Sequence, residues 1–233
     1  SSAIVSFCSN HSKREGKQLL KKYFGKASGT MKHDVELYGE PEYKESREIV
    51  ITRPQLEHNY VWLCYPGTPV GAPGEAAEDM LLSIFGQGMD SRLFTEVREK
   101  KGLCYGISAF NIGHRDCGAT LITSSTREEN VENMLALVEE EIQKIKTELV
   151  TEEELERARN KYRASSYAIT ERSSSLARTE LTRRFFNLSS QEELEAEANK
   201  VTVEDIRMVA QRMFDDTKKL VLICKEGEVE DVD

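Results

Sequence analysis

The sequence predicts an α+β domain in which helices stack on one face of an antiparallel sheet of about six strands. Short β-branched and apolar runs bounded by Gly, Pro or Ser occur near both ends and in the middle of the chain. Longer segments between them carry apolar residues at helical spacing. Strands follow strands and helices follow helices, whereas a parallel α/β sheet would require strict alternation.

The predicted strands are apolar runs that break at turn residues. Val61 and Leu63 alternate with Tyr60 and Trp62, which is typical of a strand with one buried face. The runs near the two ends of the chain have polar flanks and similar length, which weakly suggests two repeated modules. The six predicted strands are 2–8, 47–53, 57–65, 103–112, 117–124 and 218–224.

The predicted helices have start signals of the capping type. Thr126 can cap a helix that runs to Lys146, and Thr151 with Glu154 forms a capping box that opens a charged helix through about Thr170. Ser190 with Glu193, and Thr202 with Asp205, predict two last short helices in the same way. The other predicted helices are 11–24, 76–85, a short helix that ends at Gly102, and 175–186.

Composition bounds the class of protein. With 233 residues and a net charge of −9, the chain can build a core but has no cationic excess for a polyanion, so nucleic acid is an unfavourable partner. No apolar run is long enough to span a membrane, and no signal peptide is visible. The five cysteines form no CxxC pair, which indicates free thiols in a reducing, cytoplasmic compartment.

Several kinds of catalytic site are excluded by the motifs. The four histidines form neither HExxH nor HxxEH, so the chain predicts no metal site of its own. Gly86 and Gly88 do not form a dinucleotide loop, because the third glycine position holds Ser91 and the turn follows a helix. No GxSxG motif occurs, and Cys104 has no histidine nearby in the sequence to activate it.

The stretch 86–110 reads as a glycine turn, a short helix and a strand. Asp90 or Ser91 can cap the helix, and Gly102 can take the left-handed conformation that ends it. Arg98 and Tyr105 lie at this junction. A guanidinium and a phenol both donate hydrogen bonds without losing a proton at neutral pH, so they suit a polarised carbonyl or an oxyanion.

The alternative for this pair is purely structural, and the residues alone favour it. In that interpretation Arg98 forms a salt bridge with Glu96 or Glu99, and Tyr105 is a packed strand residue.

The segment GQGMDSRLFTEVREKKGLCYGISAF closely resembles the signature of the C-terminal half of zinc peptidases of the pitrilysin/insulinase family, especially the processing-peptidase group. VTEEELERARNKYRASS resembles the long helix that follows the signature. The resemblance implies two similar α+β halves that form a clamshell around a chamber. It assigns residues 1–25 to the last strand and helix of the N-terminal half, 26–45 to a linker, 46–225 to the C-terminal half-domain, and 226–233 to an acidic tail.

The resemblance also implies a split active site. The zinc ion and its HxxEH motif belong to the N-terminal half, so this chain binds no metal. Arg98 and Tyr105 are the family's arginine and tyrosine, which hold the substrate backbone and hydrogen-bond the oxyanion. Gly102, Leu103 and Ser108 are the expected substrate-binding residues at the adjacent sheet edge.

Two functions are therefore expected. In the first, the chain is the C-terminal half of a cytoplasmic zinc-dependent endopeptidase that hydrolyses peptides in the chamber, with the N-terminal half or a companion subunit as its partner in a homodimer or heterodimer. In the second, the chain is a non-catalytic structural or substrate-recognition subunit. The presence of both Arg98 and Tyr105 favours the first, because a structural subunit requires neither.

Overall fold

The computed structural model describes residues 4–27 and 45–228, so most of the predicted linker lies outside the described residues. Two short 3₁₀ turns, η2 (Glu128–Asn130) and η3 (Asp216–Lys218), precede α3 and β5. The strands are β1 (Arg47–Arg53), β2 (Asn59–Gly67), β3 (Gly106–Gly113), β4 (Gly118–Thr126) and β5 (Leu220–Glu226). The helices are α1 (Lys13–Phe24), α2 (Glu75–Gly86), the π-helix η1 (Phe94–Lys100), α3 (Val131–Thr147), α4 (Glu152–Thr170), α5 (Ser173–Phe186), α6 (Gln191–Ala198) and α7 (Val203–Met213).

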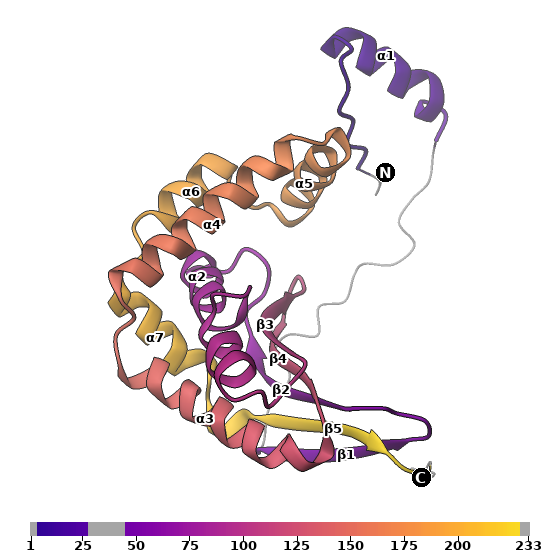
Figure 1. Cartoon of the computed structure of the whole chain (residues 1–233). Coiled ribbons are helices and arrows are strands. Elements are labelled where there is room, and N and C mark those ends of the chain that lie inside the picture. Colours follow the sequence, from indigo (N-terminus) through magenta and orange to yellow (C-terminus); the bar gives the residue numbers. More distant parts are fainter. Residues whose placement is uncertain (1–3, 28–44, 229–233) are drawn as a thin grey trace.

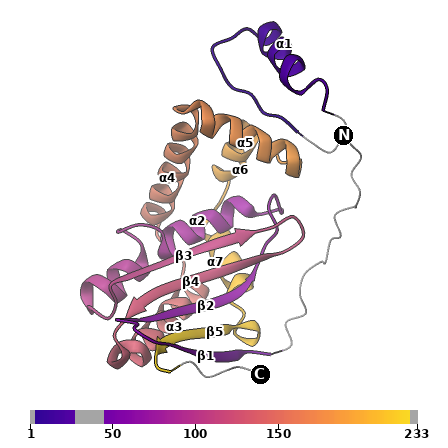
Figure 2. The same cartoon turned by 90° about the vertical axis from the view of Figure 1, so that its right-hand side faces the viewer.

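The strands of the described residues form one sheet in the order β1-β5-β2-β4-β3 (Figure 2). β3 pairs with β4, β4 with β2, and β2 with β5, each antiparallel. β1, however, runs parallel to β5, with Arg47 opposite Leu220. The expected α+β class is confirmed, but the prediction of a wholly antiparallel sheet is wrong at this edge.

The predicted first strand, 2–8, is also wrong over its described part. Residues 4–8 adopt no regular structure, which leaves five strands in the described part instead of about six. A strand needs a partner for its backbone groups, and the described sheet offers none here. The side chains of Ile4, Val5 and Phe7 remain almost half exposed for the same reason.

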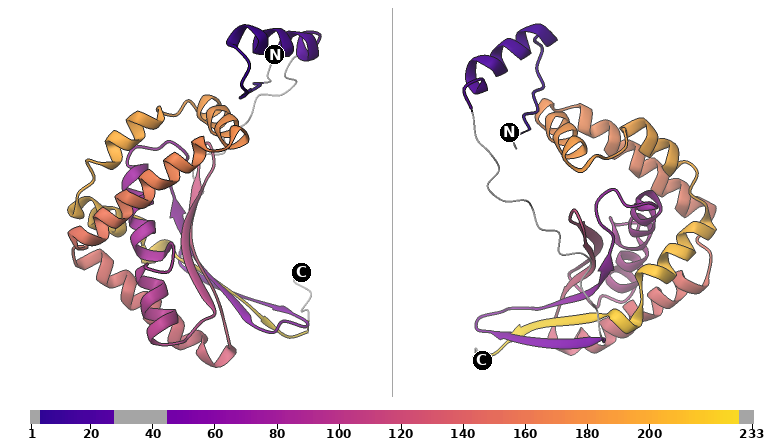
Figure 3. Two further views of the ribbon diagram at one scale, coloured as in Figure 1. Left: turned by 45° about the horizontal axis from the view of Figure 1, so that its top comes forward. Right: turned by 180° about the vertical axis from the view of Figure 1, so that it is seen from behind.

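The helices that follow β1 cover one face of this sheet (Figure 1; Figure 3, left). α2 lies at the centre of the core and is buried around most of its circumference, from Ala76 to Phe85. Apolar residues of α3 and α7, such as Ile142 and Ile206, surround it. No described helix is both long and apolar enough to cross a bilayer.

The opposite face of the sheet carries none of these helices, and apolar side chains line it. Opposite residues on neighbouring strands share a face, so Trp62 lies between Leu222 and Thr123. Tyr60 stacks beside Trp62, with ring centroids 6.1 Å apart, and is 42% exposed. This open face is therefore apolar over β2 and β5, and it carries the polar residues Ser108, Thr123 and Ser125 over β3 and β4.

Local start signals in the sequence were mostly accurate. The capping boxes at Thr151, Ser190 and Thr202 are all present. Thr126 does not cap α3, because its hydroxyl donates to the Leu103 carbonyl and thereby joins β4 to the turn before β3. The last strand, predicted to end at Cys224, extends in β5 to Glu226, which pairs with Arg53 in the sheet.

Gly86 sets the distance between α2 and β3. A Cβ atom at this position would lie 2.5 Å from the Cβ of Ala109 and 2.6 Å from its backbone nitrogen. Both neighbours belong to a paired strand and cannot move aside independently. Glycine therefore allows the end of the central helix to touch β3.

We expect Gly86→Ala to lower the free energy of unfolding by about 1–3 kcal/mol, because overpacking against a backbone outweighs the usual gain in helix propensity. Gly106→Ala is the matched control, since nothing lies within 4 Å of a Cβ at that position. Urea unfolding of both variants measures the difference. Equal stability of the two variants would show that the contact at Gly86 imposes no constraint.

Candidate functional site

Arg98 and Tyr105 are carried by η1 and the turn that follows it. The π-helix presents Arg98 to solvent while Val97 is fully buried. Gly102 then adopts φ +62°, as predicted, and its N–H donates to the Arg98 carbonyl at 3.0 Å. Single π-helical turns are rare and occur frequently at functional sites.

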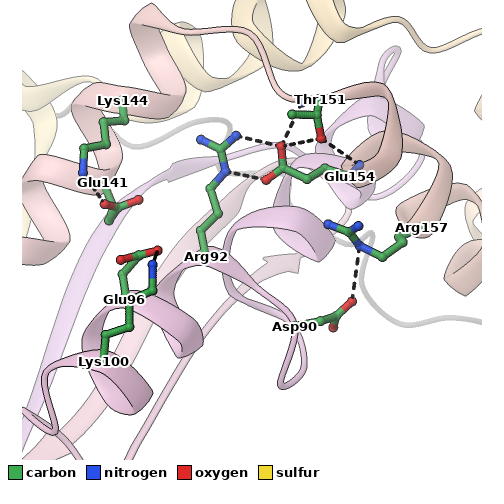
Figure 4. Close-up of polar contacts among 9 residues, drawn as sticks. All are labelled: Asp90, Arg92, Glu96, Lys100, Glu141, Lys144, Thr151, Glu154 and Arg157. Carbon is green, nitrogen blue, oxygen red and sulfur yellow. Dashed lines mark hydrogen bonds and ion pairs between the residues drawn. The ribbon is translucent and has the colours of Figure 1, made fainter.

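A partly buried ion pair fixes the start of this segment (Figure 4). Nε and a terminal nitrogen of Arg92 donate to the two carboxylate oxygens of Glu154, at 2.7 and 2.9 Å. The same carboxylate accepts from the Thr151 backbone N–H at 2.8 Å in the capping box of α4. Glu154 therefore joins the signature segment to the start of α4.

Electrostatics at this junction favour the charged pair. Burial raises the pKa of the Glu154 carboxyl, but the hydrogen bonds from Arg92 and Thr151 outweigh burial, so the net pKa lies below its ordinary value. Only 18% of the Arg92 side chain and 16% of the Glu154 side chain are exposed.

The predicted cap at Asp90 or Ser91 is not formed. The Ser91 hydroxyl instead donates to the Gly88 carbonyl at 2.8 Å. The Asp90 carboxylate faces α4, where it pairs with Lys161 and lies 3.9 Å from Arg157 (Figure 4). Two cations of α4 outcompete the helix start for this carboxylate, and the glycine turn is thereby held to α4.

Arg98 and Tyr105 are brought together at the edge of the sheet. Nε of Arg98 donates to the Tyr105 carbonyl at 2.8 Å, and its guanidinium lies 4.5 Å from the centre of the Phe94 ring. Within the described part of the chain, the two terminal nitrogens of Arg98 have no partner. Tyr105 precedes β3 and is 47% exposed.

The specific contacts expected in the structural alternative are not formed. Glu96 pairs with Lys100 at 2.7 Å, and Arg98 forms no ion pair among the described residues. Tyr105 is not a packed strand residue, because its ring is at the surface. Both side chains are thus oriented by the fold and still available to a ligand.

The other predicted site residues take different positions. Gly102 is exposed beside Arg98, and a Cβ there would meet no neighbour within 4 Å. The Leu103 side chain packs against the core, and its N–H donates to the Val97 carbonyl at 3.1 Å. Ser108 lies within β3, with its hydroxyl 3.1 Å from that of Thr123. The N–H of Leu103 and the hydroxyl of Ser108 therefore form hydrogen bonds within the domain.

Two residues at the site were not predicted. The ring of His58 lies 4.3 Å from that of Tyr105, and Nε of Arg127 donates to the Tyr105 hydroxyl at 3.0 Å. The predicted strand 57–65 includes His58, whereas in the structure this residue lies just before β2. The signal that could have identified both is register, since each flanks a strand that lies close to Tyr105 in the sheet.

The described residues give little support to a metal site or to a nucleophilic cysteine. No group of three or more His, Cys, Asp or Glu side chains in residues 4–27 and 45–228 is arranged to hold a metal ion. Burial raises the pKa of the Cys104 thiol, which disfavours the nucleophilic thiolate. What the site offers is a set of hydrogen-bond donors on a rigid edge.

The fold agrees with comparisons to known proteins. Residues 2–162 match the family described as the peptidase M16 inactive domain. The chain therefore belongs to this family, which confirms the resemblance to the C-terminal half of zinc peptidases.

Individual relatives point the same way. The chain is 37% identical over 111 residues to an "uncharacterized zinc protease" of Rickettsia felis, a match that covers 47% of this chain and 27% of the relative. It is 25% identical over 209 residues to the "uncharacterized zinc protease YmxG" of Bacillus subtilis, which covers 88% and 48%.

A solved structure shows the same fold. The crystal structure of a protease from Helicobacter pylori superimposes with a TM-score of 0.83 at 21% identity, covering 94% of this chain and 54% of that one. The chain thus spans about half the length, or less, of the proteins it matches here.

The Glu154 junction generates a prediction about pH. Because the folded-state pKa of Glu154 is lowered, its stabilising contribution is present above the ordinary value of 4.5 and is lost as pH falls through the folded pKa. We expect Glu154→Gln to cost about 2–3 kcal/mol at pH 7, the scale of breaking a buried charged pair. The cost should shrink below pH 4.5.

Denaturant unfolding across pH measures this effect. Glu153→Gln is the matched control, because it removes an exposed carboxylate from the same first turn of α4. A destabilisation that is independent of pH, or equal in the two variants, would contradict the assignment.

Proposed function

We propose that this chain is the C-terminal half of a zinc-dependent endopeptidase, and that it supplies substrate-binding and oxyanion-stabilising groups to a zinc site on a companion half. The observation that carries the proposal is the pairing of Arg98 and Tyr105. A 2.8 Å hydrogen bond joins the Arg98 side chain to the Tyr105 backbone carbonyl, and both residues are exposed at one edge of the sheet.

The chemistry of each residue follows from its donors. The terminal nitrogens of Arg98 can bind backbone carbonyl groups of a peptide. The hydroxyl of Tyr105 can donate to the oxygen that becomes negative when water adds to the peptide carbonyl. Because the backbone of Tyr105 is held by Arg98, both donors are placed before substrate arrives, and no reorganisation is needed at the moment of reaction.

The described residues do not fit a zinc ion, so no catalytic step is assigned to a metal on this chain. Zinc held by the companion half would supply a polarised, nucleophilic water. This division of groups is supported by the family, which is described as an inactive domain, and by relatives that carry the name zinc protease.

The sheet offers a surface for an extended peptide. β3 is an edge strand of the described sheet, so its outer backbone groups can pair with another strand. The strand begins one residue after Tyr105, which places a bound peptide within reach of the donors.

In the complete protein, we expect Tyr105→Phe to lower kcat by roughly 10- to 1,000-fold, the scale of losing one oxyanion donor. Zinc content should be unchanged, because Tyr105 is not a ligand. Peptide cleavage and metal analysis measure the two quantities. Tyr167→Phe, which alters an exposed tyrosine on α4, is the control. Full activity of Tyr105→Phe would contradict the oxyanion role proposed for this residue.

For the chain by itself, we expect no stoichiometric zinc and no peptidase activity, because its described residues contain no metal-binding cluster. Metal analysis after purification in zinc-containing buffer, followed by a peptide cleavage assay, tests this. One tightly bound zinc ion per chain would overturn the proposed division between the halves.

A further inference from the structure

Three strand ends meet at the edge that carries Tyr105. The first residue of β2, Asn59, pairs with Thr126 at the end of β4. The first residue of β3, Gly106, pairs with Ser125, also near the end of β4. The residues just outside these pairs, His58, Tyr105 and Arg127, are therefore neighbours although they come from three separate segments.

Tyr105 has partners at its backbone, its ring and its hydroxyl. Its N–H donates to the Ser125 carbonyl at 2.9 Å, and its carbonyl accepts from Arg98 at 2.8 Å. The tilted ring of His58 covers one face of the phenol at a centroid distance of 4.3 Å. Arg127 donates to the hydroxyl oxygen at 3.0 Å. Backbone, ring and hydroxyl are thus each fixed by a different partner.

In the hydrogen bond between Arg127 and the Tyr105 hydroxyl, the donor is known. A guanidinium has donors only, so the phenol oxygen must act as the acceptor in this hydrogen bond. The phenolic proton is then left for a different acceptor. A hydrogen bond accepted by the oxygen also polarises the O–H group and strengthens it as a donor.

Neither neighbour has an evident structural task. The Arg127 side chain is 64% exposed, and its ion pair with Glu129, at 3.8 Å, is also exposed, so it contributes little to stability. Nδ1 of His58 is buried and has no hydrogen-bond partner within the described residues. The observed role of the imidazole is therefore its contact with the Tyr105 ring.

We propose that Arg127 and His58 are positioning residues that make Tyr105 a fixed, outward-directed hydrogen-bond donor for the substrate carbonyl. His58 fixes the plane of the ring, and Arg127 fixes the direction of the hydroxyl proton. This inference rests on the proposed function, and it assigns roles to two residues that the signature segment does not contain.

The test has two arms. In the complete protein, we expect Arg127→Leu to lower kcat about tenfold with little change in KM, because the Tyr105 donor is weakened chiefly in the transition state. Arg127→Lys should recover part of the loss, since lysine can donate to the same oxygen. Arg115→Leu, at the opposite end of the hairpin formed by β3 and β4, is the matched control. His58→Leu should lower kcat in the same direction.

The proposed role of Arg127 also predicts that the effect of Arg127→Leu on kcat depends on the Tyr105 hydroxyl. In a Tyr105→Phe background, Arg127→Leu should have no further effect on kcat, because the hydroxyl on which it acts is gone. A role in folding alone would give equal losses in both backgrounds. Equal losses, or full activity of Arg127→Leu beside an impaired Tyr105→Phe, would overturn the proposal.

The second arm does not need peptidase activity. In the 233-residue chain labelled with ¹³C at the tyrosine Cζ, Arg127→Leu and His58→Leu should each shift the Tyr105 resonance, and Arg115→Leu should not. If the complete protein proves inactive, the proposed function fails, and these spectra still decide whether the two residues position Tyr105. An unmoved resonance in both variants would overturn the positioning roles.

Discussion

The geometry of the site depends on the carboxylate of Glu154. It accepts a bidentate pair from Arg92 and a backbone N–H at the start of α4, so one side chain joins two segments that are far apart in the sequence. Breaking such a pair leaves the other charge partly buried, which is costly. The signature segment therefore cannot shift against the helix layer, and the position of η1, with Arg98 on it, is set from behind the site.

The sheet fixes the site from the other side. The Tyr105 backbone N–H donates to the Ser125 carbonyl, which ties Tyr105 to β4. The Thr126 hydroxyl donates to the carbonyl of Leu103, two residues before Tyr105. The turn that carries Gly102 is thus held between the helix layer and the strands. The backbone thus fixes where the two exposed side chains begin, and contacts such as the hydrogen bond from Arg98 to the Tyr105 carbonyl fix their direction.

The parts of the fold that the sequence could predict are those with local causes. Thr151 and Glu154 lie three residues apart and form their capping box without help from the rest of the chain. The parallel pairing of β1 with β5 joins Arg47 to Leu220, and no local pattern encodes a partner at that separation. Arg127 was missed for the same reason, because its meeting with Tyr105 is a consequence of strand register.

The exposure of Arg98 and Tyr105 is consistent with the proposed active site, in which a companion half supplies the remaining groups. In water, hydrogen bonds from Arg98 and Tyr105 to a peptide compete with solvent and gain little. When a companion half covers the edge and excludes water, the same donors act in a medium of lower dielectric constant and stabilise developing charge far more strongly. The chain places its partly buried ion pair at Glu154, where it orients the segment, and leaves the substrate-facing donors uncovered. Under the proposed function, the site would therefore gain its strength on assembly with a companion half, whereas its hydrogen-bond geometry is already present in this chain.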